Sequence, residues 1–311
     1  MINYYKYLPV SAEDENWGLV VLNAGCTHIE PGTPYPYQEH PSHHYFNWAN
    51  GRVLHEYQII YITKGEGIFE SERAGEHLIE AGSVILLYPE ERHRYKPKEE
   101  TGWDEYWIGF RSSIFTNQLE KGFFDPKFPV IKAGFQENLL NLFQEIIAIT
   151  KEEKAGYQSL TSGAALHIIG HLYTILKQSQ FAGQAVDQLV NKARCIFRSN
   201  IEKNISPQEV ADELQVGYSW FRKAFKAYTG LAPGQYLIQL KIQKAKELLQ
   251  NPTKSIKEIT YELNFESRFY FSKIFKEKTG LTPVQYRSHI AGEENGNFNR
   301  QNKTYKAIFR A

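Results

Sequence analysis

The chain has 311 residues, and its 36 Lys and Arg nearly balance 35 Asp and Glu, which leaves a formal net charge of +1. This length fits two domains that each bury a core, and the 42 % hydrophobic and 14 % aromatic content excludes a disordered chain. No apolar run approaches the ~20 residues of a membrane span, and Met1–Val10 lacks a signal-peptide pattern. Cys26 and Cys195 lie too far apart for a disulfide framework or a cysteine zinc site, and they fit a cytoplasmic protein.

Residues 53–110 contain short strand-like runs that are separated by Gly, Pro and charged residues. The runs are Tyr57–Thr63, Ile68–Ser71, His77–Ile79, Val84–Tyr88 and Tyr106–Phe110. We expect Lys64–Gly67 to form a turn, and the even spacing of the strands predicts a small β-barrel or jelly roll.

Histidines in this half raise the question of a metal site. Gly82–His93 resembles the second half of a cupin motif, but no His-x-His pair precedes it, and His55 and His77 stand alone. A Pro-rich segment carries three more histidines: His40, His43 and His44. They have the chemistry to bind a metal, but such histidines are more commonly surface loop residues. We therefore expect neither a metal site nor a cofactor.

Trp103, Glu105 and Trp107 alternate along one expected strand, so they share one of its faces. Two flat aromatic surfaces and a carboxylate acceptor suit a hydroxyl-rich, weakly apolar ligand such as a sugar. His93 and Tyr95 share a face in the preceding segment. The alternative is that both tryptophans belong to the barrel core, because large aromatic side chains usually serve packing.

Two amphipathic helices are expected next, at Phe135–Thr150 and Tyr157–Gln178. The apolar stripe of the first comprises Leu139, Leu142, Phe143, Ile146 and Ile147. The stripe of the second comprises Leu160, Ala164, His167, Ile168, His171, Leu172 and Ile175. Ser179–Ala185 has the composition of a linker between domains.

The neutral total hides an acidic half and a basic half. Residues 1–186 hold 15 Lys and Arg against 23 Asp and Glu, a balance of −8, and residues 187–311 hold 21 against 12, a balance of +9. Such asymmetry points to nucleic acid as the partner of the basic half. A solvated lysine surface would give the same count, so the motifs must decide.

The basic half contains one helical unit twice, at residues 206–236 and 255–286. Each copy opens with a capping box, Ser206–Glu209 or Ser255–Glu258, and continues through a short helix, a turn and a second helix. A Gly followed by a Pro ends each second helix. This order predicts two helix-turn-helix units, joined by a long helix at Gln235–Gln250.

The second helix of each unit has an apolar face and a basic face. The polar positions are Ser219, Arg222, Lys223 and Lys226 in the first unit, and Arg268, Phe269, Ser272, Lys273 and Lys276 in the second. A major groove admits such a helix, and Arg or Lys can donate to guanine edges. We expect the two helices to enter adjacent grooves. The alternative is an ordinary amphipathic helix with a solvated charged face.

Four segments of the second unit resemble the AraC-type transcription regulator signature. They are Ile256–Ile259, Asn264–Ser267, Tyr270–Lys276 and Thr279–Arg287. The resemblance covers roughly residues 187–290 and implies that bases are read by Ser219, Arg222, Lys223, Arg268, Phe269 and Lys273. Asn264 replaces the usual Gly, and Phe269 replaces a small or polar residue, where it either contacts a thymine methyl group or packs.

A weaker resemblance links the acidic half to the sugar-sensing domain of arabinose-responsive members of that family. The segments that carry it are Ala24–Glu30, Arg52, His93–Tyr95 and Trp103–Trp107. It implies ligand contacts at Thr27, Arg52, Tyr95 and Trp107, with Glu105 at a ligand-facing position that varies; His93 and Trp103 complete our candidate set. Family members dimerise through helices at the position of Phe135–Thr150 and Tyr157–Gln178, although these helices would equally suit packing on the barrel.

We therefore expect an α+β protein of two domains. Residues 1–178 would form a cupin-like barrel with its helices, 179–186 a linker, 187–290 an all-α double helix-turn-helix domain, and 291–311 a polar, mobile tail. The expected function is that of a DNA-binding transcription regulator, not an enzyme, which senses a small molecule, with a saccharide as first candidate. Expected partners are double-stranded DNA, the effector and a second copy of the chain; RNA polymerase is a further candidate, and a membrane is not expected. The alternatives are a ligand-independent regulator and a cupin-type sugar enzyme with a DNA-binding appendage.

Overall fold

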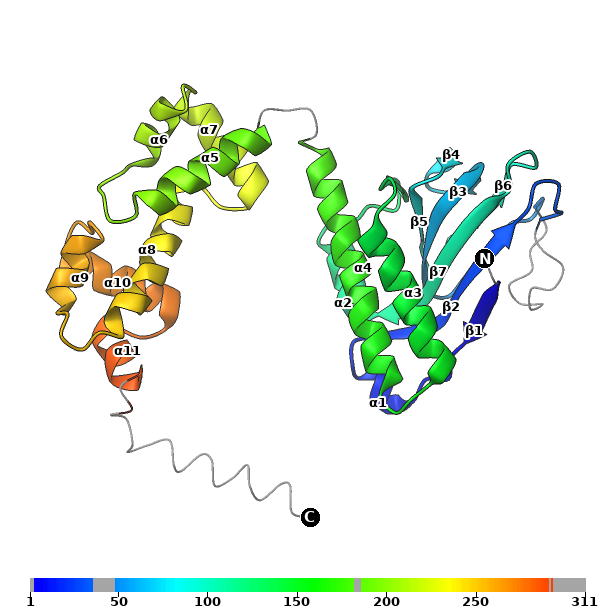
Figure 1. The fold of residues 1–311 in the computed structure, drawn as a ribbon, viewed down its shortest axis with the longest axis horizontal. Helices are drawn as coiled ribbons and strands as arrows, with labels where there is room; N and C mark the ends of the chain where they lie inside the picture. Colours follow the sequence, from blue (N-terminus) through cyan, green and yellow to red (C-terminus); the bar gives the residue numbers. More distant parts are fainter. Residues whose placement is uncertain (1–2, 36–47, 182–185, 291, 293–311) are drawn as a thin grey trace, which may run out of the picture. The chain divides into compact units, whose positions relative to one another are not determined.

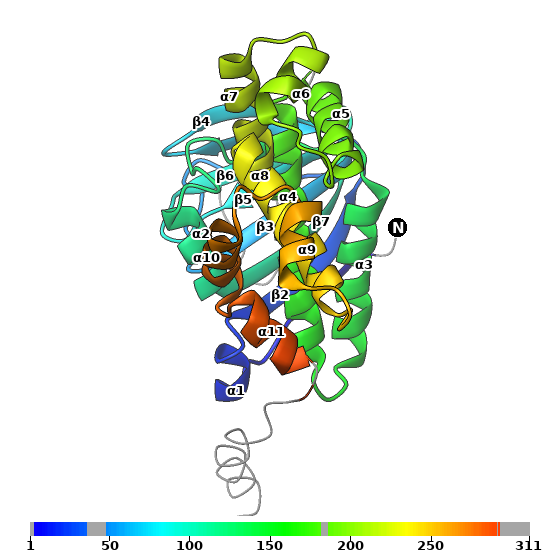
Figure 2. The ribbon, with the colours of Figure 1, turned by 90° about the vertical axis from the view of Figure 1, so that its left-hand side faces the viewer.

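A computed structural model describes residues 3–35, 48–181, 186–290 and 292 (Figures 1 and 2). The chain divides into two compact units, residues 1–180 and 181–311. The first is an antiparallel β-domain with helices and the second is entirely helical in its described part, which confirms the expected fold class. His40, His43 and His44, most of the expected linker, and all of the tail except Gly292 lie outside the described residues.

The N-terminal unit is built on antiparallel strands that run in the order β1-β2-β7-β3-β5-β8, with β4 and β6 both paired to β3. The strands are β1 Tyr4–Tyr7, β2 Leu19–Ile29, β3 Tyr57–Ser71, β4 Gly75–Glu80, β5 Ser83–Leu87, β6 His93–Pro97, β7 Trp103–Ser112 and β8 Val130–Lys132. Every strand-like run between residues 53 and 110 lies in one of them, except that Tyr88 follows the end of β5. Strand β2 was not expected, although Ala24 and Cys26 of one face alternate with Asn23, Gly25 and Thr27 of the other.

The turn expected at Lys64–Gly67 is wrong, because β3 continues through it as one long bent strand. The first part of β3 pairs with β5 and β7, and the part from Glu66 onward pairs with β4 along one edge and with β6 along the other. The bend needs glycine for space: a Cβ on Gly65, which has φ +86°, would lie 2.1 Å from the carbonyl oxygen of Gly102. Gly65 and Gly67 therefore permit the neighbouring strands to approach β3 closely at the position where a turn was predicted.

Helices α3 (Glu137–Glu152) and α4 (Tyr157–Ser179) cover one face of the sheet (Figures 1 and 2). The predicted stripe of α3 is buried in one large core with residues of β2, β3 and β7. The stripe predicted for α4 is only partly right: Ala164, Ile168 and Leu172 are buried, whereas Leu160 is 64 % exposed and His167 also faces solvent. These two lie seven residues apart, on the outward side of the helix.

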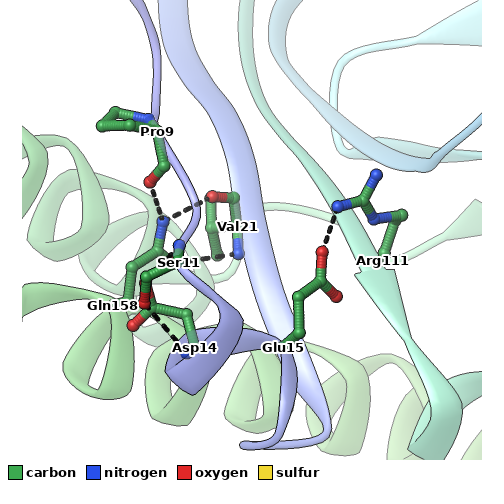
Figure 3. A network of polar contacts seen from close by, with 7 residues as sticks. All are labelled: Pro9, Ser11, Asp14, Glu15, Val21, Arg111 and Gln158. Atoms are coloured by element: carbon green, nitrogen blue, oxygen red, sulfur yellow. Dashed lines mark hydrogen bonds and ion pairs between the residues drawn. The ribbon is translucent and has the colours of Figure 1, made fainter.

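Polar contacts fasten the start of α4 to the sheet (Figure 3). The buried Gln158 amide donates to the carbonyl of Val21 at 3.0 Å and to that of Pro9 at 3.3 Å, and its oxygen accepts from the Val21 N–H. Short helices α1 (Ala12–Glu15) and α2 (Ser113–Glu120) complete the unit. Glu15 of α1 forms an ion pair with Arg111 of β7 (Figure 3).

The C-terminal unit consists of seven described helices. They are α5 Val186–Ser199, α6 Pro207–Glu213, α7 Tyr218–Thr229, α8 Pro233–Leu249, α9 Ile256–Glu262, α10 Arg268–Thr279 and α11 Pro283–Ile290. The predicted capping boxes are present, with Ser206 and Ser255 each accepting from a backbone N–H at 3.2 Å. Gly230 and Gly280 end α7 and α10 in the left-handed conformation. Both predicted helix-turn-helix units therefore form, and α8 joins them (Figure 1).

Candidate DNA-reading surface and effector site

Helices α7 and α10 each turn an aromatic face inward and a basic face outward. Phe221 and Phe225 are fully buried in the core of the first unit, and Phe271 and Phe275 in the core of the second. All eight candidate DNA-binding residues are exposed: Ser219, Arg222, Lys223, Lys226, Arg268, Phe269, Lys273 and Lys276. Six of the eight are Lys or Arg, so each helix presents positive charge on the side opposite its core.

The two exposed faces correspond in part through the 50-residue repeat, although Arg222 aligns with Ser272 and Arg268 aligns with Tyr218. Lys223 and Lys226 match Lys273 and Lys276, and Ser219 matches Phe269. Phe269 is 81 % exposed, so the packing role considered for it is wrong within the described chain. A large apolar ring left in solvent on a basic helix is suited to a thymine methyl group.

Sequence reasoning missed Trp220, which is 48 % exposed on the flank of α7 beside the basic face. Its counterpart in α10 is Tyr270, which is half-buried near Phe265 with a ring-centroid distance of 6.3 Å. The repeat alignment would have drawn attention to this aromatic pair.

In the N-terminal unit, Trp103, Glu105 and Trp107 lie on one face of β7, as predicted. The strand register sets Glu105 between Thr27 and Ile62. All three β7 side chains are nearly inaccessible, at 1 %, 3 % and 8 % exposure, and both tryptophans join a second hydrophobic core. This core is on the side of the sheet away from α3 and α4. Both indole rings therefore contribute to this core, and Glu105 is the polar group beside them.

Arg52 brings three of the other candidates together. Its guanidinium donates to the Tyr95 hydroxyl at 2.6 Å and to Nε2 of His93 at 3.3 Å. It also lies 5.2 Å from the centre of the Tyr95 ring, and the Tyr95 ring is 6.1 Å from that of Trp103. Thr27 is half-buried opposite Glu105. The candidate residues thus form one cluster on a single face of the barrel.

The electrostatics of this cluster are set by burial. Burial raises the pKa of Glu105 to about 8, although the Arg52 guanidinium and the Trp103 indole lower it in part. Burial, followed by the charge of Arg52, lowers the pKa of His93 to about 3. At neutral pH Glu105 is therefore mostly a neutral acid and His93 a neutral imidazole. Oε2 of Glu105 has no hydrogen-bond partner among the described residues.

Three residues of the same face were missed by sequence reasoning. Asn23 is 4 % exposed, and its Oδ1 also has no partner among the residues that the structure describes. Gln58 accepts from Arg52 at 3.4 Å, and the ring of Tyr35 lies 6.2 Å from those of Tyr95 and Trp103. The alternation of residues 23–27 carried the signal for Asn23, because polar or small residues there alternate with Ala24 and Cys26 of the core under the helices.

Among the described residues, no group of three or more His, Cys, Asp or Glu side chains is arranged to hold a metal ion. Within the same part of the chain, no helix is both long and apolar enough to cross a membrane.

Comparisons with known proteins agree with this division into two parts. Residues 32–169 match the family described as AraC-like ligand binding domain, and residues 210–289 match a helix-turn-helix domain. The chain is 26 % identical over 249 residues to the Msm operon regulatory protein of Streptococcus mutans, covering 76 % of this chain and 86 % of that protein. It is 24 % identical to the MmsAB operon regulatory protein of Pseudomonas aeruginosa, covering 78 % of each. It is also 26 % identical to the lactose operon transcription activator of Staphylococcus xylosus, covering 78 % of this chain and 87 % of that one.

Proposed function

The chain belongs to the AraC-type DNA-binding transcription regulators, and from that premise we propose that its N-terminal unit binds a saccharide effector. It is a regulator with an effector-binding domain and not an enzyme, because the relatives that it resembles are named as regulatory proteins and activators. The proposed effector contacts are Thr27, Arg52, His93, Tyr95, Trp103, Glu105 and Trp107. Because its target is DNA, we also propose a cytoplasmic location.

One observation carries the saccharide proposal: two buried acceptors, Oδ1 of Asn23 and Oε2 of Glu105, have no hydrogen-bond partner within the described part of the chain, and they lie on a face lined by aromatic rings. A buried acceptor without a partner is unfavourable, and ligand hydroxyl groups would satisfy both. The ring of Trp107 lies in the strand register between these two acceptors and offers an apolar surface to a sugar ring. The lactose operon activator, a relative by sequence, is consistent with a sugar signal.

Tryptophan fluorescence with a panel of monosaccharides and oligosaccharides tests this proposal. We expect at least one sugar to give a saturable change, and Trp107→Phe to weaken its binding. Trp17→Phe is the matched control, because Trp17 lies in the same unit but is 59 % exposed. If no sugar binds and the chain still binds DNA, the ligand-independent regulator becomes the better account.

For DNA, we propose that α7 and α10 enter adjacent major grooves and that the eight exposed residues above contact bases and phosphates. The six cations on these faces support this, because Lys and Arg displace counterions from phosphates. The affinity for a specific duplex should therefore fall steeply with salt concentration. Binding that is insensitive to salt, or equal for all sequences, would contradict the proposal.

We further propose that the protein acts as a homodimer, with RNA polymerase as a second protein partner. The outward face of α4 supports the homodimer, since Leu160 is 64 % exposed there and, among the described residues, a Cβ built on Gly163 or Gly170 would meet nothing within 4 Å beyond the backbone of its own helix. An effector controls such a protein only if it binds one conformation better than another. Sedimentation of the full chain tests the homodimer, and Leu160→Glu is expected to convert it to a monomer.

A further inference from the structure

The C-terminal unit carries its two DNA-reading helices on two separate hydrophobic cores. The core of the first helix-turn-helix repeat contains α7, and the core of the second repeat contains α10. Helix α8 belongs to both, through Leu237 in the first core and Ile242, Ala245 and Leu249 in the second. Since a single helix is the covalent link, contacts beside it must hold one core at a fixed angle to the other.

A polar bridge beside α8 supplies such contacts. The side-chain amide of Asn264 donates to the backbone carbonyl of Glu202 at 2.8 Å, which joins residues 62 positions apart in the chain. The ammonium group of Lys241 in α8 donates to the backbone carbonyl of Asn264 at 3.1 Å. Lys244, on the next turn of α8, lies 4.0 Å from the carboxylate of Glu202. The loop of the first unit, the shared helix and the turn of the second unit thus form one closed set of contacts, which we call the Asn264 bridge.

Lys241 and Asn264, at the centre of this bridge, each lower the stability of the fold: one is a buried charged group and the other a non-glycine residue with positive φ. Lys241 is 7 % exposed, and burial lowers its pKa. A buried ammonium group needs a hydrogen-bond acceptor, and here the acceptor is the turn itself. Asn264 has φ +49°, a conformation in which Gly carries no steric penalty.

The first unit offers an internal comparison. Gln215 occupies the equivalent turn position and is also left-handed, with φ +57°. No side-chain hydrogen bond of Gln215 is found among the described residues, whereas the Asn264 side chain reaches the other unit. Both turns therefore require a residue in the left-handed conformation, but of these two residues only Asn264 also forms a side-chain hydrogen bond to the other helix-turn-helix repeat.

We propose that Asn264 is a positioning residue that fixes the spacing and angle between α7 and α10, so that the protein selects DNA by the distance between its two half-sites. This inference rests on the proposed entry of both helices into adjacent grooves. Inserting one base pair moves a half-site by about 3.4 Å along the axis and about 35° around it. A rigid pair of helices would reject that change, whereas a hinged pair would follow it.

The test uses the full chain and duplexes selected by the wild-type protein from a randomised library. Variants of the selected duplex with one base pair inserted or removed between half-sites are then compared by fluorescence anisotropy. We expect Asn264→Gly to bind the best-spaced duplex about fivefold more weakly, the value of one lost hydrogen bond. We expect its penalty for altered spacing to shrink by a similar factor. Thermal unfolding should stay unchanged, because glycine suits the left-handed turn.

Two further variants distinguish positioning from a general loss of stability. Asn264→Asp tolerates the same φ but cannot donate to the Glu202 carbonyl, so it should relax the spacing preference as well. Gln215→Gly makes the same backbone change without touching the bridge, and it should leave the preference intact. Full spacing discrimination in both Asn264 variants, or an equal relaxation in Gln215→Gly, would overturn the inference. Failure of the wild-type chain to select any duplex would instead contradict the proposed DNA contacts.

Discussion

Glu105 allows a quantitative prediction, because its carboxyl group is buried between two tryptophans. The pKa of this group rises from 4.5 to about 8 in the folded chain. Between these values the folded state holds one proton more than the unfolded state, so the free energy of unfolding decreases as the pH rises. The full shift corresponds to about 5 kcal/mol, and relaxation and water entry around the charged form should reduce the observed effect to about 2–4 kcal/mol.

Glu105→Gln removes this titration while keeping the shape of the side chain. At about pH 3.5 the variant should be as stable as the wild type, because the Glu105 carboxyl is then neutral in both the folded and the unfolded state. At about pH 9 it should be more stable, by the 2–4 kcal/mol estimated above. Urea unfolding followed by tryptophan fluorescence measures this, since Trp103 and Trp107 flank Glu105 in sequence. The exposed Glu76→Gln should show no such dependence on pH. A stability difference between Glu105→Gln and wild type that stays constant with pH would refute the buried neutral carboxyl.

The other predictions concern packing, DNA contact and capping. Gly25→Ala should destabilise the N-terminal unit by about 2 kcal/mol, because its Cβ would lie 2.3 Å from the Trp107 indole ring. Gly163→Ala should raise the helix stability by about 1 kcal/mol in thermal unfolding, because its Cβ would meet no described residue outside its own helix. Arg222→Ala and Lys273→Ala should each cost about 1–3 kcal/mol of binding at a different half-site in footprinting, and equal loss at both half-sites would disprove the assignment. Ser255→Ala should lower the unfolding free energy of the C-terminal unit by about 1 kcal/mol through loss of a helix cap; an unchanged midpoint would contradict that role.

The helical half of the fold could be predicted in detail because its signals are local. Ser206 and Ser255 cap helices because each side chain accepts from a backbone N–H only three residues further on, and Gly230 and Gly280 end helices through their own backbone freedom. The helix-turn-helix repeat occurs twice, so each capping and helix-ending signal in the first copy is supported by the same signal in the second.

The barrel could be predicted only in outline because its decisive contacts are distant in sequence. Gly65 and Gly67 have the same local appearance in a turn as in a strand that another strand approaches closely. The residues that approach them, Gly102 at Gly65 and Lys96 at Gly67, are distant in the sequence. Likewise, the alternation around Asn23 signals a strand, but only the pairing of β2 with β7 sets Asn23 opposite Gly109 on the face that contains Glu105.

The central claim is that a sugar held in the N-terminal unit changes how the C-terminal unit binds DNA. Fluorescence anisotropy of the selected duplex, titrated with the full chain in the presence and absence of each sugar in the panel, tests it most directly. The account predicts that one sugar shifts the DNA affinity of the wild-type chain, while Trp107→Phe needs a higher concentration of that sugar for the same shift. An affinity that no sugar alters, or a response that is identical in wild type and Trp107→Phe, would contradict it.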